Sequence, residues 1–521
     1  MTLDRHIARS MQSAWLRKCL LALMFLVAWA FYNSIQLHHD VAWYVYCNLR
    51  QLEGMRPYID IIEVSPPIAF YLTLLPVAVS VLTGLSVKLC VVTYVLALTA
   101  LSLWLALSFD TAAGPSERQW KAIGIAAVLL IVPIAVFAQR EHFAVLLGLP
   151  YFFAAAARRE GRSIAWWPAL VAGLTAGIGL SIKHYFLLAP FLVEAYLVVS
   201  SRSLRSLFRP EIYGALISGA AYAAFVLLVH PEYLTVSVPL ILAAYEAYSL
   251  PLWLASIQPV ALAMLLGSAF FLMARRFIAN VPTADVLFVA GVAFVICYFW
   301  QGKGWPYHGL PANLLLSMAS IELASRAISG RAVILRLSAR QRWTLPLASF
   351  FLILCQTIQS GYYRNQFAED AAPYIARYAP HGRIFMMSSN LSTGFPLVLD
   401  TDARWSSRYA TQWLLPDILR GQQLGAANSP ARRQQLEWLT KTDIDTTVAD
   451  FETYKPNLVF VDLTYQSRPT RIYNGISVDM IAYYNRDPRF AAIWRHYRKV
   501  ATINSYLSDE ERNVELWARQ D

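Results

Sequence analysis

The sequence predicts a mostly helical protein, a polytopic bundle of transmembrane helices followed by a small extracytoplasmic α/β domain. Of its 521 residues, 57% are hydrophobic and only 15% are charged, whereas soluble chains are about one quarter charged. Long apolar runs recur up to residue 360 and are separated by short basic clusters. From residue 361 onward, charges return at ordinary density. We therefore expect a transmembrane domain over 1–360 and a soluble domain over 361–521.

Eleven stretches are apolar enough to be read as spanning helices, for which the hydrocarbon core requires roughly 20 residues. One further apolar run, from Pro67 to Leu82, is expected to be juxtamembrane or half inserted, because counting it as a span would reverse every later loop. The eleven predicted spans lie near 18–36, 88–109, 122–138, 142–157, 165–182, 185–200, 211–229, 252–273, 284–300, 309–327 and 343–360.

The distribution of lysine and arginine predicts which side each loop faces, because these residues accumulate on the cytoplasmic side of a membrane. With the N-terminus inside, the basic clusters all fall on the cytoplasmic face. We therefore expect a multi-pass protein of the inner (plasma) membrane, with a cytoplasmic N-terminus and a periplasmic C-terminal domain. The clusters are Arg17/Lys18, Arg118/Lys121, Arg158/Arg159/Arg162, Arg202/Arg205/Arg209, Arg275/Arg276 and Arg331/Arg336/Arg340/Arg342.

Two other classes of protein are disfavoured. The net charge of +11 does not indicate a nucleic-acid partner, because the basic residues are dispersed between apolar runs rather than gathered in one patch. The five cysteines form no CxxC pair and indicate neither a zinc site nor a disulfide framework.

The tail is predicted to be an α/β domain because strand-like runs alternate with polar helical segments. The runs from Arg383 to Met387 and from Asn457 to Asp462 are strand-like, and Arg432 to Thr440 is typical of a helix. The tail contains no cysteine, so its core alone must hold it together.

The first predicted outer loop carries an ordered polar motif. Asp40 and Tyr44 lie four residues apart, so a helix would place them on one face. An alternative is that Asp40 merely caps the helix after the first span, a role worth about 1 kcal/mol. The full motif consists of Asp40, Tyr44, Gly54, Pro57, Tyr58, Asp60, Glu63, Pro66 and Pro67.

In its order and spacing, this motif resembles the first outer loop of the GT-C superfamily of membrane glycosyltransferases, in particular the protein mannosyltransferases and lipid A aminoarabinose transferases. The resemblance is best over the first 200 residues. It implies that Asp40 is a general base, which takes the proton of an acceptor hydroxyl attacking a polyprenyl-phosphate sugar. It also implies that Tyr44, Tyr58, Asp60 and Glu63 belong to the site. Many members have a second acid where this chain has Val41, so a divalent cation (Mg²⁺ or Mn²⁺) is left open.

A second group, Gln139-Arg140-Glu141-His142, lies between two apolar runs with almost no loop. Charges at the bilayer centre cost about 2.5–3.5 kcal/mol each, so we expect this group at the outer interface or in a wet cavity. An ordinary turn with an internal ion pair is the alternative. The resemblance implies that Glu141 lies near the catalytic centre, where His142 would orient it or share a divalent cation with it.

A third group is Lys183-His184-Tyr185, in which Lys183 would contact a donor phosphate or simply snorkel to the interface. His184 is included in the predicted site.

The fourth group runs from Gln301 to His308 and contains Lys303 and Trp305. Lys303 and His308 are predicted to bind donor phosphate together with Arg140, while Trp305 would stack on a sugar or bound the isoprenoid groove. Ordinary interfacial anchoring is the alternative for Trp305 and Tyr307.

Two other clusters have a structural alternative. The outer segment from His230 to Leu250 is expected to lie on the membrane surface, anchored by aromatic residues. The tail cluster would bind carbohydrate or phosphate, or dock its domain, and comprises Arg404, Trp405, Arg408, Tyr409 and Trp413.

The leading functional hypothesis is transfer of a sugar from a polyprenyl phosphate to an extracytoplasmic glycan, lipid or protein by inverting displacement. It requires residues far apart in the sequence to converge on one outer cavity in contact with membrane lipid. A transporter or flippase is the alternative, for which we would expect paired repeats and charges at the midplane. A noncatalytic scaffold that anchors the tail is a third hypothesis.

Overall fold

The computed structural model describes residues 2–110, 114–329, 361–423, 429–467, 471–473, 475–507 and 510–520, with isolated helical positions between 344 and 359. Its internal contacts divide the chain into two compact units. We call the first the helical unit; it consists of Met1–Ile35, Val79–Phe225 and Leu250–Tyr362. We call the second the mixed unit; it consists of Gln36–Ala78, Val226–Ser249 and Tyr363–Asp521.

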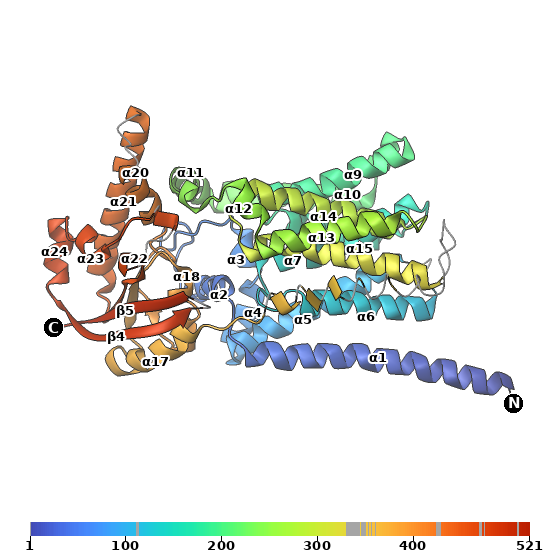
Figure 1. Ribbon diagram of the computed structural model, residues 1–521, viewed down its shortest axis with the longest axis horizontal. Coiled ribbons are helices and arrows are strands. Elements are labelled where there is room, and N and C mark those ends of the chain that lie inside the picture. The colour runs from blue at the N-terminus through green and yellow to red at the C-terminus, as the bar shows by residue number, and fades with distance from the viewer. Residues whose placement is uncertain are drawn as a thin grey trace. The chain divides into compact units, whose positions relative to one another are not determined.

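The helical unit is a bundle of apolar helices (Figure 1). At its centre, α7 is buried along nearly its whole length, as expected of a helix that is apolar on all sides. The bundle helices are α1 (Thr2–Ser34), α5 (Val87–Phe109), α6 (Pro115–Ile131), α7 (Arg140–Arg159), α8 (Trp166–Leu180), α9 (Leu188–Ser201), α10 (Pro210–Val229), α12 (Leu252–Ser256), α13 (Pro259–Arg275), α14 (Pro282–Gln301) and α15 (Leu310–Ser329), with 3₁₀ turns η1 (His184–Leu187), η2 (Leu204–Leu207) and η5 (Pro306–Gly309).

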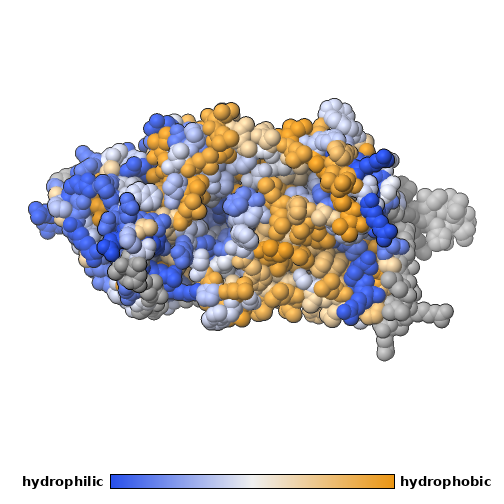
Figure 2. All heavy atoms as spheres, turned by 90° about the horizontal axis from the view of Figure 1, so that it is seen from above, coloured by the Kyte–Doolittle hydropathy of each residue, from blue (hydrophilic) through white to orange (hydrophobic). Residues whose placement is uncertain are grey.

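Within the described residues, five helices are long and apolar enough to cross a membrane: Ser13–Ser34, Val87–Phe109, His184–Ser201, Pro210–Val229 and Pro282–Gln301. Figure 2 shows apolar side chains gathered on one face of the molecule. Large apolar side chains of this bundle are exposed, among them Leu216 and Leu266. Half of the positions of the predicted span 343–360 lie outside the described residues. The basic cluster Arg331/Arg336/Arg340/Arg342 lies wholly outside them. The total of eleven spans stays a prediction.

The apolar run from Pro67 to Leu82 forms two short helices, α3 (Ile68–Tyr71) and α4 (Leu74–Thr83). The ten residues of α4 extend about 15 Å, half the thickness of a hydrocarbon core. This length agrees with the expectation that the run does not cross the membrane as a full span.

The mixed unit contains a five-stranded sheet of order β2-β1-β3-β5-β4. Strands β2, β1 and β3 are parallel, and β5 runs antiparallel to both β3 and β4. The strands are β1 (Arg383–Met387), β2 (Arg404–Trp405), β3 (Leu458–Asp462), β4 (Tyr497–Leu507) and β5 (Glu510–Arg519). The predicted mostly helical fold with a small C-terminal α/β part is confirmed.

Helices accompany this sheet along the C-terminal part of the chain (Figure 1). The sequence did not predict the β4–β5 hairpin, whose outer residues are largely polar. The helices are α17 (Gln366–Tyr378), α18 (Leu391–Gly394), α19 (Leu397–Asp400), α20 (Leu415–Gln423), α21 (Pro430–Tyr454), α22 (Thr464–Ser467), η7 (Arg471–Tyr473), α23 (Met480–Tyr484) and α24 (Pro488–Trp494).

Two segments from earlier in the sequence belong to the mixed unit. The first includes α2 (His39–Leu52), and its loop joins the C-terminal residues through a hydrogen bond from Ile62 N to Arg408 O of 2.8 Å. The second contains η3 (Tyr233–Ser237), α11 (Val238–Ala244) and η4 (Tyr245–Tyr248). It buries Leu240 in the core of the unit, whereas Leu242 on its other face is 79% exposed.

Candidate functional site

Asp40 lies in the first turn of α2 but does not cap that helix. The cap is His38, whose Nδ1 accepts a hydrogen bond from Asp40 N at 3.3 Å. The capping alternative for Asp40 is therefore wrong. A carboxylate in the first turn of a helix is nevertheless stabilised by the helix dipole. The Asp40 side chain is 12% exposed, and Tyr44, one turn further along α2, is also buried.

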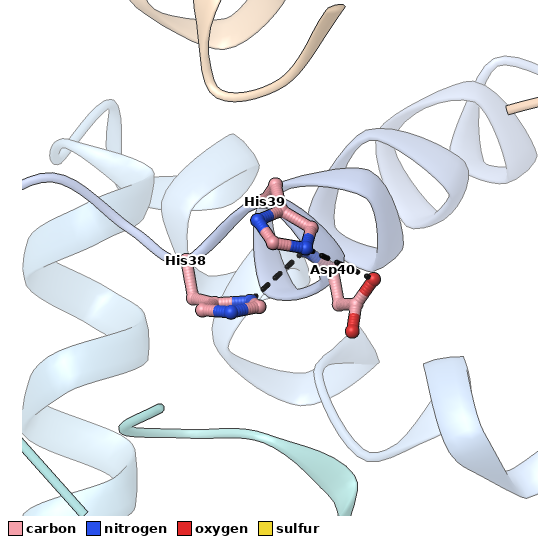
Figure 3. A group of neighbouring side chains, drawn as sticks. All are labelled: His38, His39 and Asp40. Carbon is pink, nitrogen blue, oxygen red and sulfur yellow. Dashed lines mark hydrogen bonds and ion pairs between the residues drawn. The ribbon is translucent and has the colours of Figure 1, made fainter. Parts of the chain in front are cut away.

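Figure 3 shows Asp40 beside two histidines. One ligand atom from each of His38, His39 and Asp40 lies within 4.8 Å of the others, and His39 Nε2 is 3.8 Å from Asp40 Oδ1. Two imidazoles and a carboxylate are a donor set suited to a divalent transition metal more than to Mg²⁺. Among the described residues, His38, His39 and Asp40 form the one group of three side chains that could hold a metal ion. The group does not contain Glu141 or His142, which were predicted as possible metal ligands.

His39 also contacts the C-terminal part of the mixed unit. Its Nδ1 lies 3.0 Å from Ser392 Oγ and 3.3 Å from the Tyr363 hydroxyl. Burial lowers the pKa of His39 below its usual value of 6.5, although the negative charge of Asp40 opposes this shift. The imidazole is therefore predominantly neutral at pH 7.

A series of hydrogen bonds around Glu63 connects the loop after α2 to that helix. Trp43 Nε1 donates to one oxygen of Glu63, and the other accepts from Ser65 N at 2.8 Å. Ser65 in turn accepts from Tyr58 through its carbonyl at 2.7 Å, and its Oγ lies 3.2 Å from the Tyr44 hydroxyl. Tyr58 adopts a φ of 66°, a strained conformation for an aromatic residue. Trp43 and Ser65 were not predicted as site residues.

Asp60 closes a tight turn with Arg56. Its Oδ2 accepts from Arg56 N at 2.8 Å and from Arg56 Nε at 3.2 Å. Burial acts to raise the pKa of Asp60, but these hydrogen bonds outweigh it and hold the pKa below its usual value. These contacts of Asp60 shape the loop.

In the helical unit, three of the predicted groups come together. Lys183 Nζ lies 2.6 Å from the fully buried carboxylate of Glu141 and donates to Gln301 Oε1 at 3.2 Å. The Tyr185 hydroxyl donates to the same Gln301 oxygen at 2.7 Å. A buried carboxylate needs such a partner, because removing an unpaired charge from water costs several kcal/mol. Gln301 and Tyr185 were not predicted as site residues, because the two residues are 116 positions apart and their contact depends on the fold.

The aromatic ring of Tyr307 lies near two of the cations. Arg140 Cζ is 5.8 Å and Lys183 Nζ is 5.7 Å from its centre, within the range of cation–π attraction. His308 is buried beside this ring. Burial, and then the charges of Lys183, Arg140 and Lys303, lower its pKa well below 6.5, so His308 is neutral. Tyr307, for which the sequence suggested only interfacial anchoring, thus lies among the predicted site residues.

Of the other predicted residues of the helical unit, His142 and His184 contact rings outside this cluster, whereas Trp305 lies beside His308. His142 is buried, with its Nδ1 accepting from Ala138 N at 3.4 Å and its ring 5.5 Å from that of Phe137. His184 is exposed, and its ring lies edge-on to Tyr185 at 5.0 Å. Trp305 lies 5.2 Å from the ring of His308.

The loop that carries Lys303 is packed tightly. Gly304 has a φ of 71°, and a Cβ atom there would lie 2.4 Å from Leu250 Cδ1. A hydrogen bond of 2.5 Å from Leu250 N to Gly302 O fixes the same loop. A larger residue at position 304 would be strained at this positive φ and would require the side chain of Leu250 to move.

Most of the tail cluster serves packing within the mixed unit. Arg408 forms an ion pair with Asp450 at 2.8 Å. The buried Trp405 donates from Nε1 to Tyr409 O at 2.8 Å, and the buried Trp413 accepts from the Tyr248 hydroxyl through its carbonyl at 3.2 Å. These contacts favour the structural alternative for this cluster.

No family model and no curated protein matches the chain. Among solved structures, ArnT from Cupriavidus metallidurans bound to undecaprenyl phosphate is similar, with a TM-score of 0.53 and 13% identity over 96% of this chain and 98% of that one. ArnT in the apo state gives 0.48 and 13% identity over 97% and 98%. The apo oligosaccharyltransferase of Archaeoglobus fulgidus gives 0.49 and 10% identity over 95% and 74%. This chain therefore shares the fold of ArnT along nearly its whole length, in agreement with the predicted transmembrane helix bundle followed by a small C-terminal α/β part.

Proposed function

We propose that the chain is a membrane glycosyltransferase that moves a hexosyl or pentosyl group from a polyprenyl-phosphate donor to a glycan, lipid or protein outside the cytoplasm. The observation that carries the proposal is the cluster of buried charges around Lys183 in the helical unit. The ArnT structure of the same fold contains undecaprenyl phosphate, which supports the same class of donor here.

The charges of the cluster favour an anionic ligand. Three positive charges act on His308, those of Lys183, Arg140 and Lys303. The carboxylate that contacts Lys183 is that of Glu141. Since His308 is neutral, it adds no charge of its own to these cations. A lipid phosphate beside His308 would therefore be attracted by the same three groups and held through charge-assisted hydrogen bonds.

In this proposal Glu141 holds Lys183 in position toward the donor phosphate. The amide of Gln301 and the hydroxyl of Tyr185 complete the frame around the lysine. The sugar would leave the phosphate here, while the phosphate oxygen keeps the electron pair of the broken C1–O bond. The neighbouring cations stabilise this charge, so the leaving group needs no proton.

Asp40 is proposed as the general base for the acceptor. It takes the proton from an acceptor hydroxyl while the hydroxyl oxygen bonds to C1 on the face opposite the phosphate, with inversion. Should a divalent cation take part, His38, His39 and Asp40 offer the donor set for it, and its positive charge would help to neutralise the phosphate. The proposed reaction requires Asp40 and the cations around Lys183 to be reached from the same, outer side of the membrane.

The test is sugar transfer by the purified chain in lipid nanodiscs, with polyprenyl-phosphate sugars as donors and mass spectrometry of the products. We expect Asp40→Asn to lower kcat at least about 10²-fold, the lower range of general-base contributions, while donor binding is kept. Lys183→Ala is expected to weaken donor binding instead, seen as a higher KM and a weaker thermal shift with polyprenyl phosphate.

Two matched substitutions serve as controls. Asp402→Asn changes an exposed aspartate with a φ of 50°, a conformation that asparagine also adopts readily. Lys441→Ala removes a lysine whose side chain is 76% exposed on α21. Normal transfer by Asp40→Asn, or binding of the donor lipid without transfer by the unaltered chain, would exclude the proposed reaction.

A further inference from the structure

We infer that Tyr363 and Ser392, from the C-terminal part of the mixed unit, position the proposed base Asp40 through the side chain of His39. The inference rests on the proposed function. It gives the C-terminal α/β part, whose role the sequence left open, a role in orienting the proposed base. The contacts involved all lie within the mixed unit.

Two hydroxyl groups from the C-terminal part of the chain contact the same nitrogen of His39. Ser392 Oγ and the Tyr363 hydroxyl both lie within hydrogen-bond reach of His39 Nδ1, at 3.0 and 3.3 Å. Nδ1 has one lone pair in the ring plane, and when one of these hydroxyls donates to it, the proton of the imidazole resides on Nε2. Nε2 is the nitrogen that faces Asp40 Oδ1, at 3.8 Å.

The N–H group of His39 is therefore directed at the proposed base. A separation of 3.8 Å is too long for a hydrogen bond, but the N–H dipole still favours one orientation of the carboxylate. Contacts of this kind commonly shorten when substrate binds. His39 thus restrains the carboxylate without neutralising it, and Asp40 keeps the capacity to accept a proton.

Further contacts hold the two hydroxyl groups themselves in place. Asn365, which is fully buried, donates through Nδ2 to Ser392 O at 2.6 Å. Its backbone N donates to Gln36 Oε1 at 2.6 Å, which fixes the chain just before α2. The segment from Tyr363 to Ser392 and the start of α2 are therefore one hydrogen-bonded assembly.

The middle of α2 is fastened to the same part of the chain. Trp405 N donates to the Tyr46 hydroxyl at 2.9 Å. The ring of Phe395 lies 5.1 Å from that of Trp43 and 5.6 Å from that of Tyr46. Removing the two hydroxyl groups alone leaves these contacts intact, so α2 should stay folded while His39 loses its orientation.

The experiment compares Tyr363→Phe, Ser392→Ala and the double variant in the transfer assay. We expect the double variant to lower kcat about 10- to 100-fold, a loss of the size known for hydrogen-bond partners that orient metal-bound histidines. KM for the donor should stay unchanged, because the cluster around Lys183 is untouched. His39→Gln should retain more activity than His39→Ala, because a glutamine amide can present an N–H group where Nε2 lies.

Two controls remove equivalent hydroxyl groups elsewhere. Tyr362→Phe alters the preceding residue, whose side chain is 56% exposed, and Ser477→Ala alters an exposed serine that bonds to Gln466 O. Both should leave kcat unchanged. Thermal unfolding of every variant checks that a lost rate does not reflect a lost fold.

Each outcome has a distinct meaning. If the unaltered chain transfers sugar and Asp40→Asn does not, an unchanged kcat in the double variant overturns the positioning role. A fall in melting temperature that accounts for the lost rate overturns it in the same way. Activity that a chelator abolishes in the unaltered chain, and that neither His39→Gln nor His39→Ala retains, would make His39 a metal ligand instead. If the unaltered chain transfers no sugar, the proposed function fails, and the inference falls with it.

Discussion

Lys183 illustrates how a single residue takes its role from its neighbours. A lysine near a membrane surface commonly extends toward water, but here it contacts Glu141 at 2.6 Å and Gln301 at 3.2 Å. These contacts hold its charge beside Arg140 and the ring of Tyr307. The snorkelling alternative does not explain why an amide and a buried carboxylate both face the ammonium group.

Asp443 gives a prediction at the same scale. This carboxyl on α21 is fully buried beside Tyr409, Tyr483 and Tyr484, and burial raises its pKa to about 7. In the unfolded chain the pKa is about 3.9. Between these two values the folded chain keeps a proton that the unfolded chain has released, so stability falls as pH rises from about 4 to about 7.

We therefore expect Asp443→Asn to raise the melting temperature at pH 8 and to have a much smaller effect at pH 4. Asp445→Asn, two residues along the same helix, is the control. Hydrogen bonds from Lys441 and Arg489 lower the pKa of Asp445, so its replacement should lose a little stability at pH 8. Thermal unfolding at the two pH values measures both effects, and equal shifts for Asp443→Asn at both would contradict the prediction.

At the scale of elements, α8 and α10 approach so closely that only glycine fits between them. A Cβ atom on Gly173 would lie 2.0 Å from Glu211 O, and one on Gly177 would lie 2.5 Å from Ala215 O. Small residues four positions apart are a common way to bring membrane helices together. The close approach lets dispersion forces attract the two helices, and this attraction weakens steeply if they move apart.

We expect Gly173→Ala to lower the melting temperature of the purified chain, because the new methyl group must push a backbone carbonyl away. Gly219→Ala on α10 is the matched control, since the nearest atom to its Cβ would be Ser181 Oγ at 4.0 Å. That variant should be neutral or slightly stabilising, because alanine favours a helix by about 1 kcal/mol over glycine. A neutral Gly173→Ala would show that α8 and α10 separate at little cost.

At the scale of the whole molecule, the proposed reaction draws on both units. The proposed base Asp40 belongs to the mixed unit and the cationic cluster to the helical unit. The reaction therefore requires both to be reached from the same side of the membrane. The basic clusters predict that this side is the outside.

Cysteine labelling tests this sidedness. After replacement of the native Cys19 and Cys355 by alanine, we expect a membrane-impermeant maleimide to label His184→Cys and Ser477→Cys in right-side-out vesicles. Arg202→Cys should react only in inside-out vesicles, because it lies in a predicted cytoplasmic cluster. All three positions are exposed in their units. Labelling of positions 184 and 477 from opposite sides would contradict a shared outer pocket.

Local features explain what could be predicted from the sequence. Each long apolar run predicted a helix by itself, because all of its residues favour the same apolar surroundings. The first ten predicted spans fall on helices. The strand from Arg383 to Met387 is confirmed with the same bounds. The hairpin of β4 and β5 was missed although the buried positions of β5 alternate regularly. The burial of β4 is irregular, and its pairing with β5 shifts register between Lys499 and Ala501.

The sequence by itself determined the class of fold, a membrane helix bundle with an α/β tail, because hydropathy and charge act on each segment separately. It also indicated the polar groups near Asp40, Glu141, Lys183 and Lys303. Only the tertiary structure decided how those groups are partnered: Lys183 with Glu141 and Gln301, and His39 with Tyr363, 324 positions away. Such pairs form because burying a polar group is favourable only when a partner from another segment is held within reach, and no stretch of sequence records which partner that will be.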